Sequence, residues 1–230
     1  MTDVHSHILP FVDDGSDSYE KSFEMLERAY KLGVDKIILT PHFKRFSYGT
    51  DKDKILQRFK DFESAVKERG IPVKLYLGQE ILCDEKLYDD LKEGRVLTIN
   101  STKYVFLEFD YFEYADIVDF AYNVKAMGYI PVIAHIERYK YLSAKALIDL
   151  KKDGALIQVN AASVTGEYGK AFRKKVITAI KGRLVDFVAT DTHYGREVPL
   201  CNAYKIIKKR FGTKMADDLF INNAEKFNLE

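Results

Sequence analysis

Short apolar runs alternate with longer amphipathic segments along the whole chain. The apolar runs are nearly continuous, which is typical of parallel strands that helices cover on both faces. They predict strands at Thr2–His5, Lys36–Thr40, Val73–Leu77, Tyr104–Glu108, Ile130–Ala134, Ala155–Val159 and Val185–Ala189. The segments between them predict helices at Ser18–Leu32, Lys52–Arg69, Tyr114–Met127, Ala144–Lys152, Gly169–Lys181 and Cys201–Phe211.

These strand-then-helix units follow one another without a linker rich in Pro, Gly or Ser. The pattern predicts an α/β fold in a single domain over residues 1–230. We favour a distorted TIM-like barrel of seven β/α units, with a doubly wound open sheet as the alternative. At 230 residues and 47% hydrophobic composition, the chain is long enough to bury the core of such a barrel.

Composition excludes several classes of protein. The 36 basic and 35 acidic residues almost cancel, whereas a nucleic-acid binder usually carries a strongly basic balance or face. The first residues do not resemble a secretory signal, and no apolar run approaches the roughly 20 residues that span a bilayer. We therefore expect a cytoplasmic protein that is not inserted in a membrane. Cys83 and Cys201 lie far apart and outside any CxxC pattern, which argues against a disulfide scaffold or a sulfur-rich zinc site.

All five histidines lie at or just after the end of a predicted strand. They are His5 and His7 after the first strand, His42 after the second, His135 after the fifth and His193 after the seventh. Acidic residues occupy equivalent places, namely Asp13 and Asp14, Glu80, Glu108 and Asp191. Because the C-terminal ends of barrel strands converge on one face, we expect these side chains to lie together.

Imidazole nitrogens and carboxylate oxygens without a thiolate suit divalent manganese, iron, zinc or magnesium. His5 and His7 are two apart on a strand, so both side chains point the same way and can bind one ion. The candidate ligands exceed what one ion takes, which favours two or three ions that share bridging carboxylates. Such ions can deprotonate a bridging water and clamp a phosphoryl group. One of Asp13 and Asp14 can instead form an Asx-turn before Gly15.

Two arginines stand beside these candidates. Arg138 follows His135 by three residues, and Arg196 follows His193 by three. A guanidinium group is suited to binding phosphate and to stabilising charge in a transition state. A cysteine-based phosphatase is excluded, because six residues after Cys83 and Cys201 stand Asp89 and Ile207 rather than arginine.

The motifs resemble the polymerase-and-histidinol-phosphatase (PHP) superfamily, and within it the capsule-type bacterial manganese-dependent protein-tyrosine phosphatases. The likeness runs from His5 to Asn223, and the stretch from Pro131 to Tyr139 is its most specific part. The other segments that carry it are His5-Ser6-His7, Asp13-Asp14-Gly15, Pro41-His42, Glu80, Glu108-Phe109, Gln158-Val159-Asn160 and Asp191-Thr192-His193.

The resemblance implies a seven-unit PHP-type metallophosphatase domain with three metal ions, usually Mn²⁺, with Fe²⁺, Zn²⁺, Co²⁺ or Mg²⁺ as alternatives. It places His5, His7, Glu80 and Asp191 on the first ion, and Glu80, His42 and His135 on the second. It places Asp14, Glu108 and His193 on the third, and Arg138 and Arg196 on the phosphate. The implied substrate is a phosphotyrosine protein, namely the autophosphorylating bacterial tyrosine kinase that regulates polysaccharide export.

We therefore predict hydrolysis of a phosphomonoester by a metal-bridged hydroxide, with phosphotyrosine protein as the substrate. Histidinol phosphate or another small phosphomonoester is an alternative, because the metal chemistry would be unchanged. A catalytically inactive metal-binding module is a second alternative, against which the complete ligand set and both arginines argue. The near-neutral charge disfavours a nuclease, and the sequence leaves the oligomeric state open.

Overall fold

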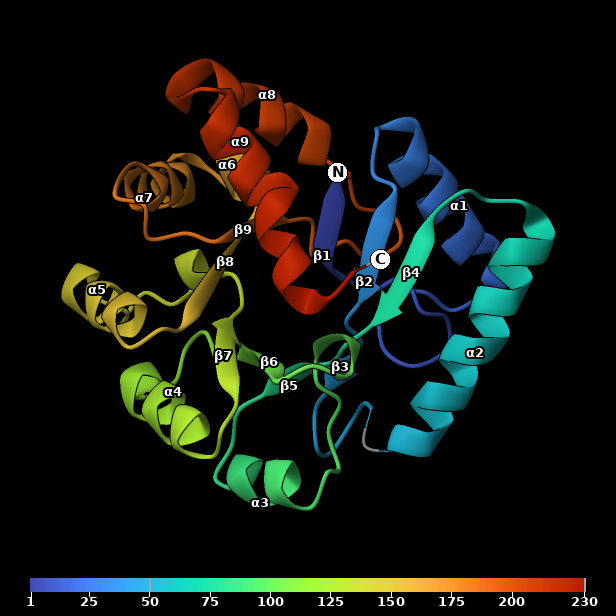
Figure 1. The fold of residues 1–230 in the computed structure, drawn as a ribbon, viewed down its shortest axis with the longest axis horizontal. Helices are drawn as coiled ribbons and strands as arrows, with labels where there is room; N and C mark the ends of the chain where they lie inside the picture. The colour runs from blue at the N-terminus through green and yellow to red at the C-terminus, as the bar shows by residue number, and fades with distance from the viewer. Residues whose placement is uncertain (50, 230) are drawn as a thin grey trace.

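In the computed structural model, which describes residues 1–49 and 51–229, a parallel sheet curls into a distorted, TIM-like half-barrel (Figure 1). One section has the strand order β1-β2-β4 and the other β3-β5-β6-β7-β8-β9. The strands are β1 (Thr2–Ser6), β2 (Lys36–Leu39), β3 (His42–Phe43), β4 (Lys74–Leu77), β5 (Glu80–Leu82), β6 (Tyr104–Glu108), β7 (Ile130–Ile133), β8 (Leu156–Asn160) and β9 (Phe187–Ala189).

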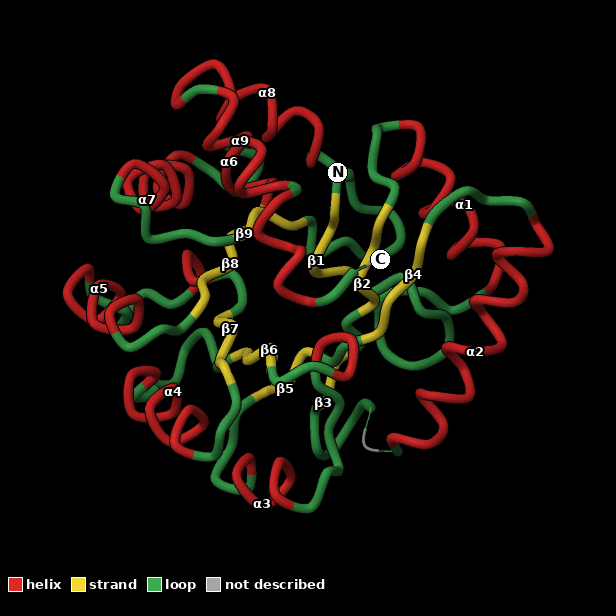
Figure 2. Tube along the Cα trace, viewed as in Figure 1, coloured by secondary structure: helices red, strands yellow, loops and turns green. Residues whose placement is uncertain are grey.

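Helices surround this sheet on its outer side (Figure 2). They are α1 (Tyr19–Lys31), α2 (Lys52–Arg69), α3 (Leu87–Lys92), α4 (Ile117–Ala126), α5 (Ala144–Lys152), α6 (Ala161–Thr165), α7 (Lys170–Lys181), α8 (Leu200–Phe211) and α9 (Thr213–Phe220). Short 3₁₀ segments are η1 (Ile99–Ser101), η2 (Ile136–Arg138) and η3 (Asn222–Phe227). Among the described residues, no helix has the length and apolar character needed to cross a membrane.

The predicted α/β barrel is confirmed, and the open doubly wound sheet is not what forms. β2 and β3 are successive parts of one strand position, as are β4 and β5, so the described residues supply seven strand positions. Backbone hydrogen bonds join the first and last strands, from the Asp191 N–H to the His5 carbonyl (2.9 Å) and from the His7 N–H to the Thr192 carbonyl (3.0 Å). These hydrogen bonds place the first candidate ligands in the sequence, His5 and His7, beside one of the last, Asp191.

Local sequence signals explain where the helices start. Ser18, Asp51 and Ser143 cap α1, α2 and α5 by accepting a hydrogen bond from the backbone N–H three residues later. At the far end of α2, Gly70 adopts φ +72°, the left-handed conformation that ends many helices. The predicted bounds of α2 and α5 are therefore those that the structure has.

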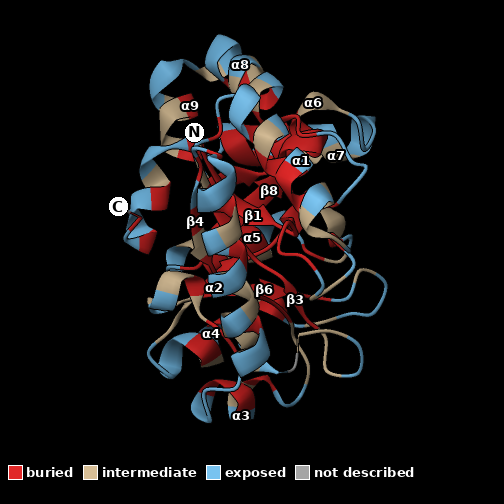
Figure 3. Cartoon of the chain, turned by 90° about the vertical axis from the view of Figure 1, so that its right-hand side faces the viewer, coloured by how far each residue is buried: buried red, intermediate tan, exposed pale blue. Residues whose placement is uncertain are grey.

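The core lies on both sides of the sheet, and most strand residues are buried (Figure 3). Helix side chains pack against the outer face, while a smaller cluster fills the interior. In that interior the ring of Phe227 in η3 meets the ring of Tyr104 edge-on and packs tilted against that of Phe187, at centroid distances of 5.1 and 5.0 Å. Those two aromatic partners lie at the N-terminal starts of β6 and β9, so the C-terminal segment covers that end of the barrel. The opposite end carries the polar cluster described next.

Candidate metal centre

All five histidines and the predicted acidic residues meet where the strands end. His5 lies in β1 and His42 in β3, while His135 and His193 follow β7 and β9. Each of the five histidines is at most 7% exposed. His135 and Asp191 adopt φ values of +26° and +53°, a left-handed backbone that is costly for residues other than glycine. The two strained residues therefore follow two of the strands that end at the cluster, β7 and β9.

Glu80 at the start of β5 is the centre of the cluster, and its side chain is fully buried. One carboxylate oxygen lies 2.8 Å from Nε2 of His135 and 3.3 Å from Nε2 of His5. The other lies 2.9 Å from Nδ1 of His42 and 3.3 Å from Nε2 of His7. A carboxylate that faces four imidazoles with both oxygens has the arrangement of a bridging ligand.

Two further carboxylates flank Glu80. Oδ1 of Asp191 lies 3.7 Å from Nε2 of His5 and 3.5 Å from Nε2 of His7. Oε1 of Glu108 lies 3.7 Å from Nε2 of His135. The Nε2 atoms of His5 and His7 are only 3.1 Å apart, as the two-residue spacing on a strand predicted.

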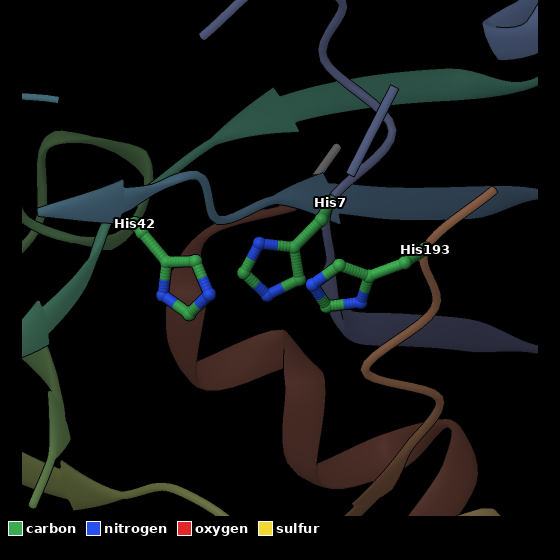
Figure 4. Close-up of side chains that lie close together, drawn as sticks. All are labelled: His7, His42 and His193. Carbon is green, nitrogen blue, oxygen red and sulfur yellow. The ribbon is translucent and has the colours of Figure 1, made fainter. Parts of the chain in front are cut away.

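The remaining candidate ligands, His42, His193 and Asp14, lie on the solvent side of the cluster. His7 lies between His42 and His193 in Figure 4, with ring centroids 4.4 and 4.2 Å away. Oδ1 of Asp14 lies 3.6 Å from Nε2 of both His42 and His193. The Asp14 side chain is 50% exposed, so this edge of the cluster is the one that a solute reaches first.

Buried polar atoms in the cluster lack hydrogen-bond partners. Among the described residues these include Nδ1 of His42, Oε2 of Glu80 and Oε2 of Glu108. The first two are 2.9 Å apart but do not form a hydrogen bond. A buried polar group without a partner costs about 1–3 kcal/mol, and a divalent cation would satisfy all three atoms. The donor set of nitrogen and oxygen atoms therefore fits the metal ions expected from the sequence.

The electrostatics of the cluster also favour a cation. Burial alone would raise the pKa of Glu80, but His5, His135 and His42 outweigh it and hold that pKa well below its usual range. Burial would lower the pKa of His7, yet Asp13 and Glu80 raise it well above its usual value. Burial, together with the charge of His7, instead lowers the pKa of His193 to about 4. His7 thus holds a proton that a metal ion would displace.

The structure distinguishes between Asp13 and Asp14. Asp13 is buried, and its Oδ2 accepts hydrogen bonds from Nδ1 of His7 (2.8 Å) and from the His42 N–H (3.0 Å). Its Oδ1 accepts one from the Gly15 N–H (2.9 Å), which is the Asx-turn considered above. Asp13 thereby holds the His7 ring with Nδ1 toward its own carboxylate and Nε2 toward Glu80. Asp14 is the one whose carboxylate faces the cluster.

The sequence analysis assigned no role to Gln158 and Asn160, whose buried side-chain amides are linked by hydrogen bonds behind the cluster. Nδ2 of Asn160 donates to Oδ2 of Asp191 (2.9 Å), and Nε2 of Gln158 donates to Oδ1 of Asn160 (2.8 Å). Oε1 of Gln158 accepts from the His135 N–H (2.7 Å). Two polar residues in an otherwise apolar buried strand were the available signal, because a buried amide needs partners.

The two arginines differ in their surroundings. Arg138 in η2 is ion-paired with Oδ2 of Asp191 (2.6 Å) and donates to the hydroxyl of Tyr111 (2.7 Å). That hydroxyl in turn donates to Oε1 of Glu108 (2.7 Å). Arg196 is exposed, and its backbone N–H donates a hydrogen bond to the His193 carbonyl (3.1 Å). Arg138 therefore touches the cluster, whereas Arg196 lies at its solvent side beside His193.

Comparison with known proteins places these observations in a family. Residues 1–228 match the family model described as capsular polysaccharide synthesis, CpsB/CapC. The tyrosine-protein phosphatase CpsB of Streptococcus agalactiae is 33% identical, over 98% of this chain and 97% of that protein. The tyrosine-protein phosphatase YwqE of Bacillus subtilis is 31% identical, over 98% of this chain and 90% of that protein.

A solved structure agrees with the same assignment. It comes from work on YwqE of Bacillus subtilis and CpsB of Streptococcus pneumoniae as metal-dependent tyrosine phosphatases, and it superposes with a TM-score of 0.92. Its identity is 29%, and the match covers 99% of this chain and 94% of that chain. A histidinol phosphate phosphatase of Lactococcus lactis shares the fold, with a TM-score of 0.60 at 15% identity over 94% of this chain and 93% of that one.

Proposed function

The chain belongs to the CpsB/CapC family of capsular polysaccharide synthesis, and from that premise we propose that it is a metal-dependent protein-tyrosine phosphatase. The observation that carries the proposal is the convergence of five imidazoles and four carboxylates, with Glu80 at the centre and buried donor atoms left unpaired. The whole chain, residues 1–230, would form one metallophosphatase domain. The cytoplasmic location expected from the sequence stays a prediction.

We propose Mn²⁺ as the metal, with three ions held by nine residues. The distances support a first group of His5, His7 and Asp191 with Glu80. They support a second group of His135 and Glu108 that shares Glu80. The remaining ligands, His42, His193 and Asp14, then form the third.

This division differs from the expected one in the place of two residues. The resemblance put His42 with His135, and Glu108 with Asp14. Nε2 of His42 lies near Asp14, and Glu108 lies near His135. Nδ1 of His42 also lies 2.9 Å from Oε2 of Glu80, which is the contact that the expected grouping requires. Nδ1 of His42 is also 3.5 Å from Oε2 of Glu108, so His42 stands where the second and third groups meet.

Bound divalent ions would supply an activated water and neutralise the charge on the phosphoryl oxygens. The protein's own residues orient the metal ligands and bind the phosphate. Asp13 and Asn160 hold His7 and Asp191 in place through the hydrogen bonds described above. Arg138, whose pKa stays above its usual value because Asp191 and Tyr111 outweigh burial, offers a permanent positive charge to the phosphate. A tyrosine leaving group, with a pKa of about 10, needs little proton donation.

We propose phosphotyrosine on a bacterial tyrosine kinase of capsule export as the substrate. The relatives named tyrosine-protein phosphatase and the description of the family as capsular support it. We also propose that Arg196 contacts the phosphate, since it lies at the open side of the site beside His193.

The test compares two substrates under controlled metal content. Chelated protein and manganese-reconstituted protein are each given a phosphotyrosine peptide and histidinol phosphate, with His7→Ala as the inactive control. Turnover that requires manganese, favours the peptide and is lost in the variant supports the proposal. A preference for histidinol phosphate moves the protein to amino-acid metabolism, and no turnover despite bound metal favours an inactive binding module.

A further inference from the structure

Lys44 follows β3 in a loop beside the candidate metal centre, and backbone hydrogen bonds hold it in place. Its N–H donates to the Tyr48 carbonyl (2.8 Å), while its own carbonyl accepts from the N–H groups of Ser47 (2.8 Å) and Tyr48 (2.9 Å). Gly49 then passes so close to β3 that a Cβ there would lie 1.9 Å from the His42 carbonyl oxygen. The side chain of Lys44 therefore starts from a well-defined point at the edge of the site.

The ammonium of Lys44 touches two of the candidate ligands. It lies 3.3 Å from Nε2 of His42 and 3.6 Å from Oε2 of Glu108, and the side chain is 28% exposed. An ammonium has only donors, so the lone pair of His42 Nε2 points at it. The Lys44 ammonium therefore lies directly beside two of the candidate metal ligands.

Lys44 and Arg138 approach the cluster from different sides. Lys44 follows β3 and Arg138 follows β7, and β5 and β6 lie between these strands in the sheet. Arg138 neutralises Asp191, and Lys44 neutralises Glu108. Each basic side chain thus balances one of the outer ligand carboxylates.

We propose that Lys44 binds the phosphoryl group of the substrate, facing Arg138 across the site; this assignment rests on the proposed function. Divalent ions on His42 and Glu108 would repel an ammonium at 3–4 Å, as like charges do at such distances. Because the backbone of Lys44 is held, only its flexible side chain moves. The nearest new partner for its charge is the anionic phosphate that approaches the same ions from the solvent side.

The experiment measures phosphate binding separately from turnover. Manganese-loaded wild type and Lys44→Met are titrated with inorganic phosphate by calorimetry, and their metal content is measured by mass spectrometry. Loss of one charge-assisted hydrogen bond predicts a Kd for phosphate raised about tenfold or more, with unchanged metal content. Lys44→Arg, which keeps the charge, should recover most of the affinity, and KM for a phosphotyrosine peptide should rise in parallel.

The matched control is Lys54→Met, which removes a lysine that is 85% exposed and pairs with Asp51 at the start of α2. It should bind phosphate as wild type does. An unchanged Kd in Lys44→Met overturns the proposal, as does a fall in manganese content, because Lys44 would then act on the metal ligands. Should Lys44→Met lose its melting transition, Lys44→Gln is measured in its place.

The outcomes also separate this inference from the proposed function. A wild-type protein that binds manganese and phosphate but hydrolyses no phosphomonoester would remove the proposed function and leave the assignment of Lys44 to be decided by the variants. A manganese-loaded wild type that binds no phosphate would remove the assignment of Lys44 as well.

Discussion

Asp3 gives a quantitative test of how the barrel is joined beneath the metal centre. It is 1% exposed in β1, and Oδ1 accepts a hydrogen bond from the N–H of Thr190 (2.9 Å), just after β9. The Thr190 hydroxyl donates to its other oxygen. Burial outweighs these hydrogen bonds and raises the pKa of Asp3 from 3.8 to about 6.

A raised carboxyl pKa means that the folded state binds this proton more tightly than the unfolded chain does. The resulting stabilisation is complete below about pH 4 and is lost as the pH rises through about 6. The interval between the two pKa values corresponds to about 3 kcal/mol, of which roughly 1–2 kcal/mol is lost between pH 5 and pH 8. Asp3→Asn keeps the shape of the side chain and cannot ionise.

The assay is urea unfolding of chelated protein at pH 5 and pH 8. We expect the free energy of unfolding to fall by about 1–2 kcal/mol more in wild type than in Asp3→Asn over this interval. Asp89→Asn, an exposed carboxyl on α3, should follow wild type. The reasoning is refuted if wild type and Asp3→Asn show the same pH dependence, because the buried carboxyl would then not ionise in this range.

Three further substitutions and one titration probe the supporting contacts of the site. Asp13→Ala removes the acceptor of His7 Nδ1–H and should lower manganese affinity about 10- to 100-fold by calorimetry, so full affinity would argue against a positioning role. Gly15→Ala would place a Cβ 2.0 Å from the His7 carbonyl oxygen, so the turn must shift, and both Tm and metal content should fall. Arg138→Lys loses the guanidinium that contacts both Asp191 and Tyr111, and kcat/KM for a phosphotyrosine peptide should fall about tenfold or more at unchanged metal content. Because the pKa of His7 is raised, manganese binding should release protons and weaken as the pH falls, and calorimetry in buffers of different ionisation enthalpy measures this; binding independent of pH would contradict it.

Periodicity predicted most of the fold because most strand residues are buried and several helices begin at a capping side chain. The β6 strand has the predicted bounds, Tyr104–Glu108. The strands β3 and β5 escaped prediction because each continues a longer strand beyond a bend, at Thr40-Pro41 and Gly78-Gln79. The helices α3, α6 and α9 were missed as well, since five to eight residues give too little periodicity to separate a helix from a loop.

The location of the candidate site was also predictable, because strand ends of a parallel barrel meet on one face. Its internal arrangement was not. Asp13 and Asp14 are adjacent in sequence, and only the hydrogen bonds to His7 and to His42, 29 residues away, separate their roles. The lysine at position 44 carries no motif, and its place beside Glu108 depends on how the loop after β3 folds back.

The central claim is that nine residues, with Glu80 at their centre, hold three divalent ions. The most direct test is a crystal structure of manganese-loaded protein, with anomalous diffraction recorded on both sides of the manganese absorption edge. The account predicts three anomalous peaks, with Glu80 bridging two of them and His42, His193 and Asp14 around the third. Peaks elsewhere in the molecule, or none among these side chains at full manganese content, would contradict it.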